Sequence, residues 1–488
     1  MKKNEKALVI IFGGTGDLAQ RKLYPSIFQL YKKGYLKENF AVIGTARRPW
    51  TDEYYREVVK DSIDGMYDEQ TVATEFASHF YYQSHNVTDT NHYKTLQALA
   101  QSLDEKYQIG GNRLFYLAMS PRFFGTICDH LKSQQIMTET GYNRVIVEKP
   151  FGRDLASATE LNDEISKSFP EEDVFRIDHY LGKEMVQNIA ALRFGNSIFN
   201  SMWNNRYISN IQVTLSEALG VEERAGYYET AGALRDMIQN HVLQIVALLT
   251  MSAPVSFTDT DIRNAKINAL KCLKIYNPEE VKENFVRGQY GPGNGLIGYR
   301  EEAQTAEDSM TETFVAGKLM VNTMDMAGVP IYVRTGKRMK TKATRIDVVF
   351  KQVPNNVFED SNLRHDVLTI NVDPEPSLSL QLNSKTIGQG FDFDTHHLNL
   401  DYKLSPEQRA AVPEAYEKLI LDAMQGRASN FAHWKELQCS WKFVDAIRQA
   451  WDQNVDQVAF PNYDCASMGP KASDDLLAKD GNHWEFNC

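Results

Sequence analysis

The chain has 488 residues, too many for one ordinary hydrophobic core, so its length predicts two or three domains. Hydrophobic residues make up 42% of it, no apolar run approaches the length of a membrane-spanning helix, and the short N-terminal apolar run ends in glycines without a signal-peptide cleavage site. The formal net charge of −11 argues against nucleic-acid binding, and five scattered cysteines without a C-x-x-C pair suggest neither disulfides nor a metal site, so we expect a reduced, cytoplasmic protein.

The first predicted element is a strand over Ala7–Phe12, whose continuous aliphatic run is typical of a parallel strand buried on both faces. A glycine turn follows, and then a helical pattern runs from Leu18 to about Lys33. The glycines and Ala19 give G-x-x-G-x-x-A, a variant of the dinucleotide-binding fingerprint, in which the backbone approaches a pyrophosphate at a helix N-terminus. A turn that binds nothing is the alternative. The predicted cofactor-binding residues are Gly13, Gly14, Thr15, Gly16, Asp17 and Leu18.

The second predicted strand, Phe40–Thr45, ends in A-R-R. Folds that bind NAD usually place Asp or Glu here for the ribose 2′-hydroxyl, whereas arginine favours a 2′-phosphate. Arg47 therefore predicts NADP, with NAD possible as a weaker or second cofactor. Solvated loop charges at Arg47 and Arg48 are the alternative.

The following segments alternate between helical and strand patterns, which indicates a doubly wound parallel sheet of the Rossmann-like kind. Helices are expected at 52–63 and 93–106, and strands at 80–83, 113–119 and 144–148. Lys149 follows the last strand, beside Pro150, where it can reach an anionic or hydroxyl-bearing ligand, and a cis bond is plausible there. Lys22 lies near the glycine turn, where a helix-surface charge is the ordinary explanation.

The segment R-I-D-H-Y-L-G-K, residues 176–183, concentrates ionisable groups. If a helix begins after Asp178, then His179 and Lys183 are four apart on one face, where two cations repel unless an anion such as phosphate lies between them. Asp178 would face elsewhere and could hold an imidazole as a base. The alternative is a capped helix start with solvated charges.

Beyond about residue 190, strand patterns follow one another with few helices between them, which predicts a mainly antiparallel sheet with helices on one face. The expected strands are 207–217, 312–319, 331–335, 345–350, 367–372 and 377–382. A helix is expected over Ala231–Leu249, and His241 falls on its apolar stripe. A lone histidine there is more often a core residue than a catalyst.

Six basic residues lie between Arg334 and Arg345, for which a solvated hairpin is the usual explanation. Amphipathic helices are expected over Pro406–Gly426 and Trp434–Asp452. We predict a nucleotide-binding domain over residues 1–178 and a substrate-binding domain over 179–488. A broad one-sided sheet needs cover, so we also expect a homodimer.

The octapeptide at 176–183, the E-K-P at 148–150 and R-D-M-I-Q-N-H at 235–241 resemble the signatures of the glucose-6-phosphate dehydrogenase family, and the resemblance extends over nearly the whole chain. It implies NADP-dependent oxidation of glucose 6-phosphate at C1 to the lactone, the first step of the oxidative pentose phosphate pathway. His241 would be the general base, oriented by Asp178, and Lys149 would lie between cofactor and sugar. The implied substrate contacts are Lys22, Lys149, His179, Tyr180, Lys183, Glu217, Asp236, Lys337 and Lys342.

Two other functions fit the same residues. The glycine turn and E-K-P also occur in NADP-linked oxidoreductases of the Gfo/Idh/MocA type, which would act on an unphosphorylated sugar. A non-catalytic sensor of NADP and a sugar phosphate is the second alternative. Inhibition by inorganic phosphate separates the first from our prediction, and formation of NADPH excludes the second.

Overall fold

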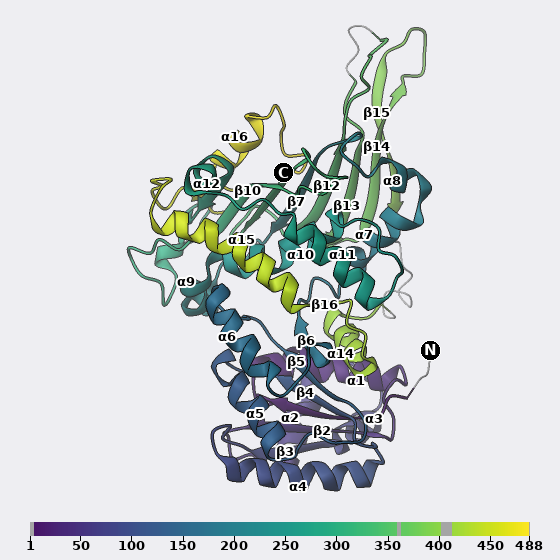
Figure 1. Ribbon diagram of the computed structural model, residues 1–488, viewed down its shortest axis with the longest axis vertical. Coiled ribbons are helices and arrows are strands. Elements are labelled where there is room, and N and C mark those ends of the chain that lie inside the picture. The colour runs from purple at the N-terminus through teal and green to yellow at the C-terminus, as the bar shows by residue number, and fades with distance from the viewer. Residues whose placement is uncertain (1–3, 359–362, 402–411, 488) are drawn as a thin grey trace. The chain divides into compact units, whose positions relative to one another are not determined.

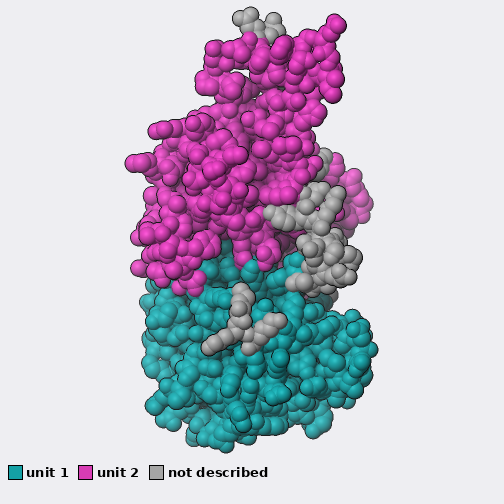
Figure 2. Space-filling view, turned by 90° about the vertical axis from the view of Figure 1, so that its right-hand side faces the viewer, with its two compact units in different colours: residues 1–182, 410–434 teal, residues 183–409, 435–488 magenta. Residues whose placement is uncertain are grey.

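The computed structural model describes residues 4–358, 363–401 and 412–487 (Figure 1). The chain forms two compact units, coloured separately in Figure 2. Unit 1 consists of Met1–Gly182 and Ala410–Trp434, and unit 2 consists of Lys183–Arg409 and Lys435–Cys488. The predicted boundary after residue 178 lies close to the first change of unit, but the return of a later segment to unit 1 was not predicted.

Two expectations from composition concern the described residues directly. Within them, no helix combines the length and apolarity that crossing a membrane requires. Four of the five cysteines are free thiols there, namely Cys128, Cys272, Cys439 and Cys465. Cys488 lies outside the described residues.

Unit 1 is built on a seven-stranded sheet in the order β16-β6-β5-β4-β1-β2-β3. Strands β1 to β6 pair in parallel and the short β16 pairs antiparallel with β6, so the predicted doubly wound sheet is confirmed. β1 is wholly buried, as its aliphatic run predicted. The strands are β1 (Ala7–Phe12), β2 (Phe40–Ala46), β3 (Phe80–Ser84), β4 (Arg113–Leu117), β5 (Asn143–Val147), β6 (Val174–Ile177) and β16 (Phe431–Ala432).

The expected helices of unit 1 are present, and α3, α5 and α6 are additional to the prediction. Helix α14 joins this unit because its apolar side, with Leu419, Ile420 and Met424, enters the core beneath the sheet. Residues 406–411 of the helix predicted there lie outside the described residues. The helices are η1 (Ala19–Leu23, π-helical), α1 (Tyr24–Lys32), α2 (Asp52–Ser62), α3 (Gln70–Ser78), α4 (Thr90–Tyr107), η2 (Pro121–Phe123), α5 (Phe124–Ser133), α6 (Leu155–Ser166), η3 (Glu171–Asp173) and α14 (Ala415–Gln425).

Unit 2 contains an eight-stranded sheet in the order β15-β14-β13-β12-β7-β11-β10-β8. Its neighbours are antiparallel except β7 and β11, which confirms a mainly antiparallel sheet. All six predicted strands form, while β8, β9, β15 and β17 are additional. The strands are β7 (Ile208–Ser216), β8 (Phe285–Gly288), β9 (Tyr290–Gly291), β10 (Phe314–Met320), β11 (Pro330–Gly336), β12 (Ala343–Phe350), β13 (Val367–Asp373), β14 (Ser377–Lys385), β15 (Phe393–Asp401) and β17 (Tyr463–Asp464).

The helices of unit 2 include a long broken one where the sequence predicted a single α-helix over Ala231–Leu249 (Figure 1). The helix is not regular as predicted, because Gly232 has φ 62° and the nine residues Leu234–Val242 are π-helical. The helices are α7 (Glu184–Gly195), α8 (Ser197–Met202), η4 (Glu222–Arg224), α9 (Ala225–Ala233), η5 (Leu234–Val242, π-helical), α10 (Leu243–Thr250), α11 (Asp259–Lys271), α12 (Pro278–Asn284), η6 (Tyr299–Glu301), α15 (Trp434–Asp452) and α16 (Ala472–Ala478).

The polar side of β7 and β11 carries the end of the chain. Gln212 on β7 donates to the carbonyl of His483 at 2.8 Å and accepts from the Glu485 amide at 2.8 Å. The guanidinium of Arg334 on β11 lies 4.2 Å from the ring centroid of Trp484. Alternate residues of a strand face opposite sides of a sheet, so this segment covers the side that these polar residues face.

Candidate functional site

The turn after β1 has the shape that close backbone approach requires. Gly13 has φ 103°, and a Cβ atom there would lie 2.2 Å from the carbonyl oxygen of Ala118. A Cβ on Gly14 would lie 2.8 Å from Cα of Gly44 on β2. The amides of Gly13 and Gly14 both donate to the Thr45 carbonyl, so they hold the turn against the sheet. The N–H groups at the start of the following helix are therefore the ones suited to a phosphate.

Other residues predicted to contact the cofactor or the substrate also lie in unit 1. Asp17 forms an exposed ion pair with Arg21 at 2.7 Å. Arg47 and Arg48 are exposed after β2, and the Arg48 guanidinium lies over the ring of Trp50 at 5.4 Å from its centroid. Lys22 is exposed on η1, which leaves both of its predicted roles open.

Lys149 follows β5, next to a buried carboxyl group. The Lys149–Pro150 bond is cis, as the sequence made plausible. Glu148 accepts from the Tyr116 hydroxyl at 2.6 Å, and burial raises the pKa of its carboxyl above the usual range. Lys149 itself is half-buried at the carboxyl ends of the strands, the edge where ligands bind in such sheets.

The octapeptide does not form the helix that its spacing was taken to allow. Residues 178–183 are a turn, and α7 begins at Glu184 with Lys183 as its N-cap residue. The carboxylate of Asp178 accepts from the amide of Tyr180 at 2.9 Å, and the Leu181 amide donates to the Asp178 carbonyl. Such local bonds favour a turn over a helix. The argument that His179 and Lys183 share a helical face is therefore wrong.

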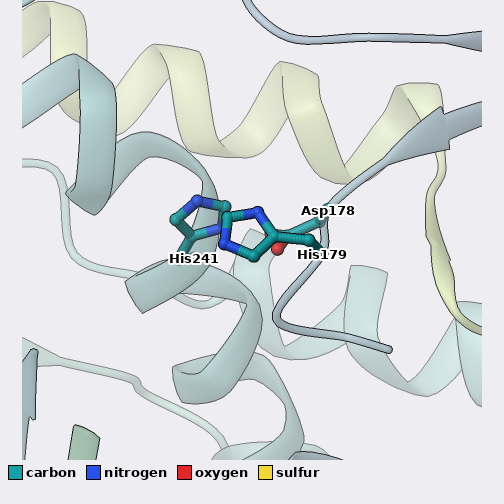
Figure 3. Close-up of side chains that lie close together, drawn as sticks. All are labelled: Asp178, His179 and His241. Carbon is teal, nitrogen blue, oxygen red and sulfur yellow. The ribbon is translucent and has the colours of Figure 1, made fainter. Parts of the chain in front are cut away.

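The side chains of this turn are largely withdrawn from water. Asp178 is 2% exposed, Tyr180 is buried and His179 is half-buried. The rings of His179 and Tyr180 lie 4.9 Å apart between centroids. Figure 3 shows Asp178 and His179 on the strand-to-helix connection that follows β6.

The π-helical segment η5 carries His241, also drawn in Figure 3, and Asp236. Both side chains are buried, at 1% and 3% exposure. The sequence argument assumed an α-helix, in which residues five apart face different ways. A π-helix bonds residue i to i+5, so Asp236 and His241 follow one another along the same side. Single π-helical turns occur frequently at functional sites.

Glu217 and Lys337 lie together in unit 2. The ammonium of Lys337 bonds the carboxylate of Glu217 and lies 5.5 Å from the ring centroid of Tyr228. Burial and then the nearby carboxylate of Asp236 raise the pKa of the Tyr228 hydroxyl well above its usual value. Three of the predicted substrate residues, Glu217, Asp236 and Lys337, thus surround one tyrosine.

The remaining two predicted lysines of unit 2 share one carboxylate. Asp373, at the end of β13, lies 2.9 Å from Nζ of Lys342 and 3.5 Å from Nζ of Lys183. Burial opposes ionisation of Asp373, but the hydrogen bond from Lys342 and the charge of Lys183 outweigh it and lower its pKa. Burial lowers the pKa of Lys183, and Asp373 offsets part of that effect.

These pairings contradict the solvated hairpin expected between Arg334 and Arg345. Arg334 is wholly buried, and the other cations of the run, apart from exposed Lys340, bond to carboxylates. Asp373 was missed by the sequence analysis. It is opposite Thr344 in the β12–β13 register, so an acidic strand end facing a basic run was the available signal.

Together, a parallel sheet with a glycine turn, a lysine at its carboxyl edge and a second unit with buried His, Asp and paired lysines define a nicotinamide-dependent oxidoreductase with a separate substrate-binding unit. Family models agree with this. Residues 10–188 match the NAD-binding domain of glucose-6-phosphate dehydrogenase and residues 190–485 match its C-terminal domain. The chain therefore belongs to the glucose-6-phosphate dehydrogenase family.

Individual relatives support the assignment over the full length. The chain is 50% identical to glucose-6-phosphate 1-dehydrogenase of Bacillus subtilis over 492 residues, covering 99% of each chain. It is also 50% identical to the Leuconostoc mesenteroides enzyme over 483 residues, with 99% of each covered. A solved glucose-6-phosphate dehydrogenase in complex with glucose 6-phosphate aligns with TM-score 0.91, at 35% identity and full coverage of both chains.

Proposed function

We propose that the protein oxidises D-glucose 6-phosphate at C1 to 6-phosphoglucono-1,5-lactone, with NADP as oxidant, as the first step of the oxidative pentose phosphate pathway in the cytoplasm. The observation that carries this proposal is the full-length family match, which includes a relative solved with that substrate. The C1 hydride leaves for the nicotinamide, the hydroxyl proton goes to a base, and a C1 carbonyl forms.

His241 is the base in this proposal, and Asp178 orients it. A general base must lie near the proton that it removes and be positioned by a partner. Support comes from nitrogen or oxygen atoms of Asp178, His179 and His241 that lie within 4.8 Å of one another (Figure 3). A buried carboxylate beside an imidazole stabilises the imidazolium that forms when the base takes the proton.

One carboxylate and two imidazoles are also ligands that a divalent cation accepts. The sequence predicts no metal. In the proposed reaction the imidazole nitrogen of His241 must be available to the sugar hydroxyl, so we assign His241 to proton transfer and not to a metal.

The substrate's phosphate is assigned to Lys183, Lys342, His179 and Tyr180. If a phosphate dianion binds here, Lys183 and Lys342 would exchange their carboxylate partner, Asp373, for the phosphate. Phosphate binding remote from C1 positions the reacting carbon. Lys22 and Lys149 are assigned to the sugar side of the cofactor, and Glu217, Asp236 and Lys337 to the sugar hydroxyls.

NADP preference rests on Arg47, with Arg48 beside it. Both are exposed at the carboxyl end of β2, where the ribose of a dinucleotide lies in this type of fold. Guanidinium groups suit a 2′-phosphate, and no carboxylate follows β2 before Asp52 to select the 2′-hydroxyl of NAD. NAD remains the weaker cofactor.

A single coupled assay tests this function. The purified protein is mixed with NADP and glucose 6-phosphate, and absorbance of NADPH is followed, with glucose and with NAD as the matched replacements. We expect rapid NADPH formation from glucose 6-phosphate, inhibition by inorganic phosphate, and little turnover of glucose. Equal turnover of glucose without phosphate inhibition would instead favour the oxidoreductases of unphosphorylated sugars.

We also propose a homodimer that covers the sheet of unit 2 at its β14–β15 end. β15 is the edge strand, and Leu398 and Leu400 on it share one face with 62% and 58% exposure. Exposed apolar residues on an edge strand favour pairing with another chain. Sedimentation of the wild type should give twice the chain mass. The double variant Leu398→Asp/Leu400→Asp should shift this mass toward that of the monomer. An unchanged mass of the variant would exclude β15 as the dimer interface.

A further inference from the structure

A buried ion pair and an amide connect three helices of unit 2, one of which, α10, continues the π-helical segment that carries His241. Lys266 on α11 and Glu436 on α15 are both 0% exposed, and their Nζ and Oε2 atoms lie 3.0 Å apart. Gln244 on α10, 1% exposed, donates to the same Glu436 oxygen at 3.0 Å. All three residues belong to unit 2, and their helices α10, α11 and α15 are labelled in Figure 1.

Filling a core with this cluster is energetically unfavourable. Moving two charges out of water is unfavourable, and apolar residues of similar volume are often at least as stabilising as a buried ion pair. Four polar atoms of the cluster and its surroundings, Nζ of Lys266, Oε1 of Gln244, Oε1 of Glu436 and Oγ of Ser440, have no hydrogen-bond partner among the described residues, so Lys266 is held to Glu436 by charge. Stability alone is therefore a weak reason for the cluster.

The position of the cluster next to η5 explains its presence better. Gln244 lies three residues after His241, in the second residue of the α-helix that continues η5. A π-helical turn holds one more residue per turn than regular α-helical bonding would, and such turns are rare. Every residue of α10 is buried, so apolar packing alone would tolerate small rotations or shifts along the helix axis. A directional bond from Gln244 to a carboxylate fixed by Lys266 excludes those shifts.

We infer that Gln244, Glu436 and Lys266 form a positioning network that fixes the axial position and rotation of α10, and so places the imidazole of His241 for proton transfer. Glu436 and Lys266 act through Gln244 and do not touch the substrate. The inference rests on the proposed role of His241 as base. It adds residues that carry no chemistry of their own but decide where the base lies.

The test separates position from stability with two variants. Gln244→Met keeps the volume and leaves the ion pair intact. Lys266→Met/Glu436→Gln removes both charges together, leaves no unpaired buried charge, and keeps an amide oxygen for Gln244. Thr250→Val is the matched control, because Thr250 is equally buried on α10 but bonds only within its own helix, to Val246.

We expect both variants to fold and to lower kcat about five- to fifty-fold, with KM for glucose 6-phosphate within about threefold, because small displacements of a catalytic group reduce turnover steeply. The acid limb of the kcat–pH profile should move, since the imidazole's surroundings change. Deuterium uptake of a peptide covering residues 234–243 should rise without substrate. Thr250→Val should change none of these.

Wild-type kcat, pH profile and deuterium uptake in either folded variant would overturn the inference and leave the cluster a packing feature. If the double variant fails to fold, Gln244→Met alone decides between the two outcomes. Failure of the proposed function is distinguishable: it shows as His241→Asn protein that retains turnover, whereas failure of the network leaves His241 essential and uptake of residues 234–243 unchanged.

Discussion

The ammonium nitrogen of Lys342 lies 2.9 Å from the carboxylate of Asp373, which also receives Lys183 at 3.5 Å. A carboxylate thus holds two cations that would otherwise repel each other. Lys183 is the more buried of the two, with a side chain 23% exposed against 62% for Lys342. Lys183 is therefore the lysine whose charge depends most on its surroundings.

The pH dependence of substrate binding follows from this arrangement. Burial lowers the pKa of Lys183 and Asp373 offsets part of the shift. A dianionic phosphate binds the protonated ammonium, which is present below that pKa and lost as pH rises through it. We expect KM for glucose 6-phosphate to rise on the alkaline side, and Asp373→Asn to move that rise to lower pH. Steady-state kinetics between pH 7 and 10 measure both effects.

A surface pair provides the control for Asp373→Asn. Glu280 lies 2.8 Å from Lys274 on the surface of the same unit, so Glu280→Gln removes a comparable carboxylate without touching the proposed phosphate site. It should leave the KM–pH curve unchanged. If Asp373→Asn also leaves the curve unchanged, Lys183 does not control phosphate binding.

Removal of the proposed base should reduce turnover. His241→Asn keeps a polar side chain of similar size but cannot accept the C1 hydroxyl proton, so kcat should fall by about 10²–10⁴-fold with little change in KM. His483→Asn, at a side chain that is 76% exposed, is the control and should behave as wild type. Near-normal turnover of His241→Asn under saturating substrate would assign the proton to another group.

The sequence predicted the strands of both sheets well because their signal is local. The aliphatic run of β1 records burial on both faces at the strand itself, and the polar–apolar alternation of β7 identifies a strand, although its polar residues are buried as well as its apolar ones. What it could not predict depends on distant partners. Helix α14 joins unit 1 through contacts with α1, almost 400 residues earlier in the chain, and nothing in its own periodicity identifies that partner.

The candidate site shows the same division. Residue types identified positions 178, 241 and 149 as candidates, and their roles stay predictions. The spacing argument for His179 and Lys183 failed because Asp178 bonds the turn that follows it. The π-helical turn around His241 could not be predicted from the sequence for a related reason. Nine residues are too few for apolar spacing alone to separate a π-helical segment from an α-helical one, so tertiary packing decides between them.

Cofactor preference should depend on Arg47. Arg47→Ser removes a guanidinium suited to a 2′-phosphate, and loss of one charge-assisted contact of about 1.5–3 kcal/mol predicts a rise of about 10- to 100-fold in KM for NADP. KM for NAD should change little, since NAD has no 2′-phosphate. Lys60→Ser on α2 is the control for a general loss of positive charge. Parallel effects on both cofactors would mean that Arg47 does not distinguish them.

The glycine turn offers a prediction in which strain and steric clash are separable. Gly13 and Gly65 both have positive φ, at 103° and 74°, but a Cβ on Gly13 would lie 2.2 Å from the backbone of Ala118, whereas nothing lies within 4 Å of a Cβ on Gly65. Gly65→Ala should therefore lower the free energy of unfolding by only about 1–2 kcal/mol, the cost of a left-handed conformation. Gly13→Ala should lower it further and weaken NADP binding, because β4 or the turn must move. Urea unfolding and dinucleotide titration of both variants measure the difference, and equal losses of stability would show that the turn accommodates a side chain.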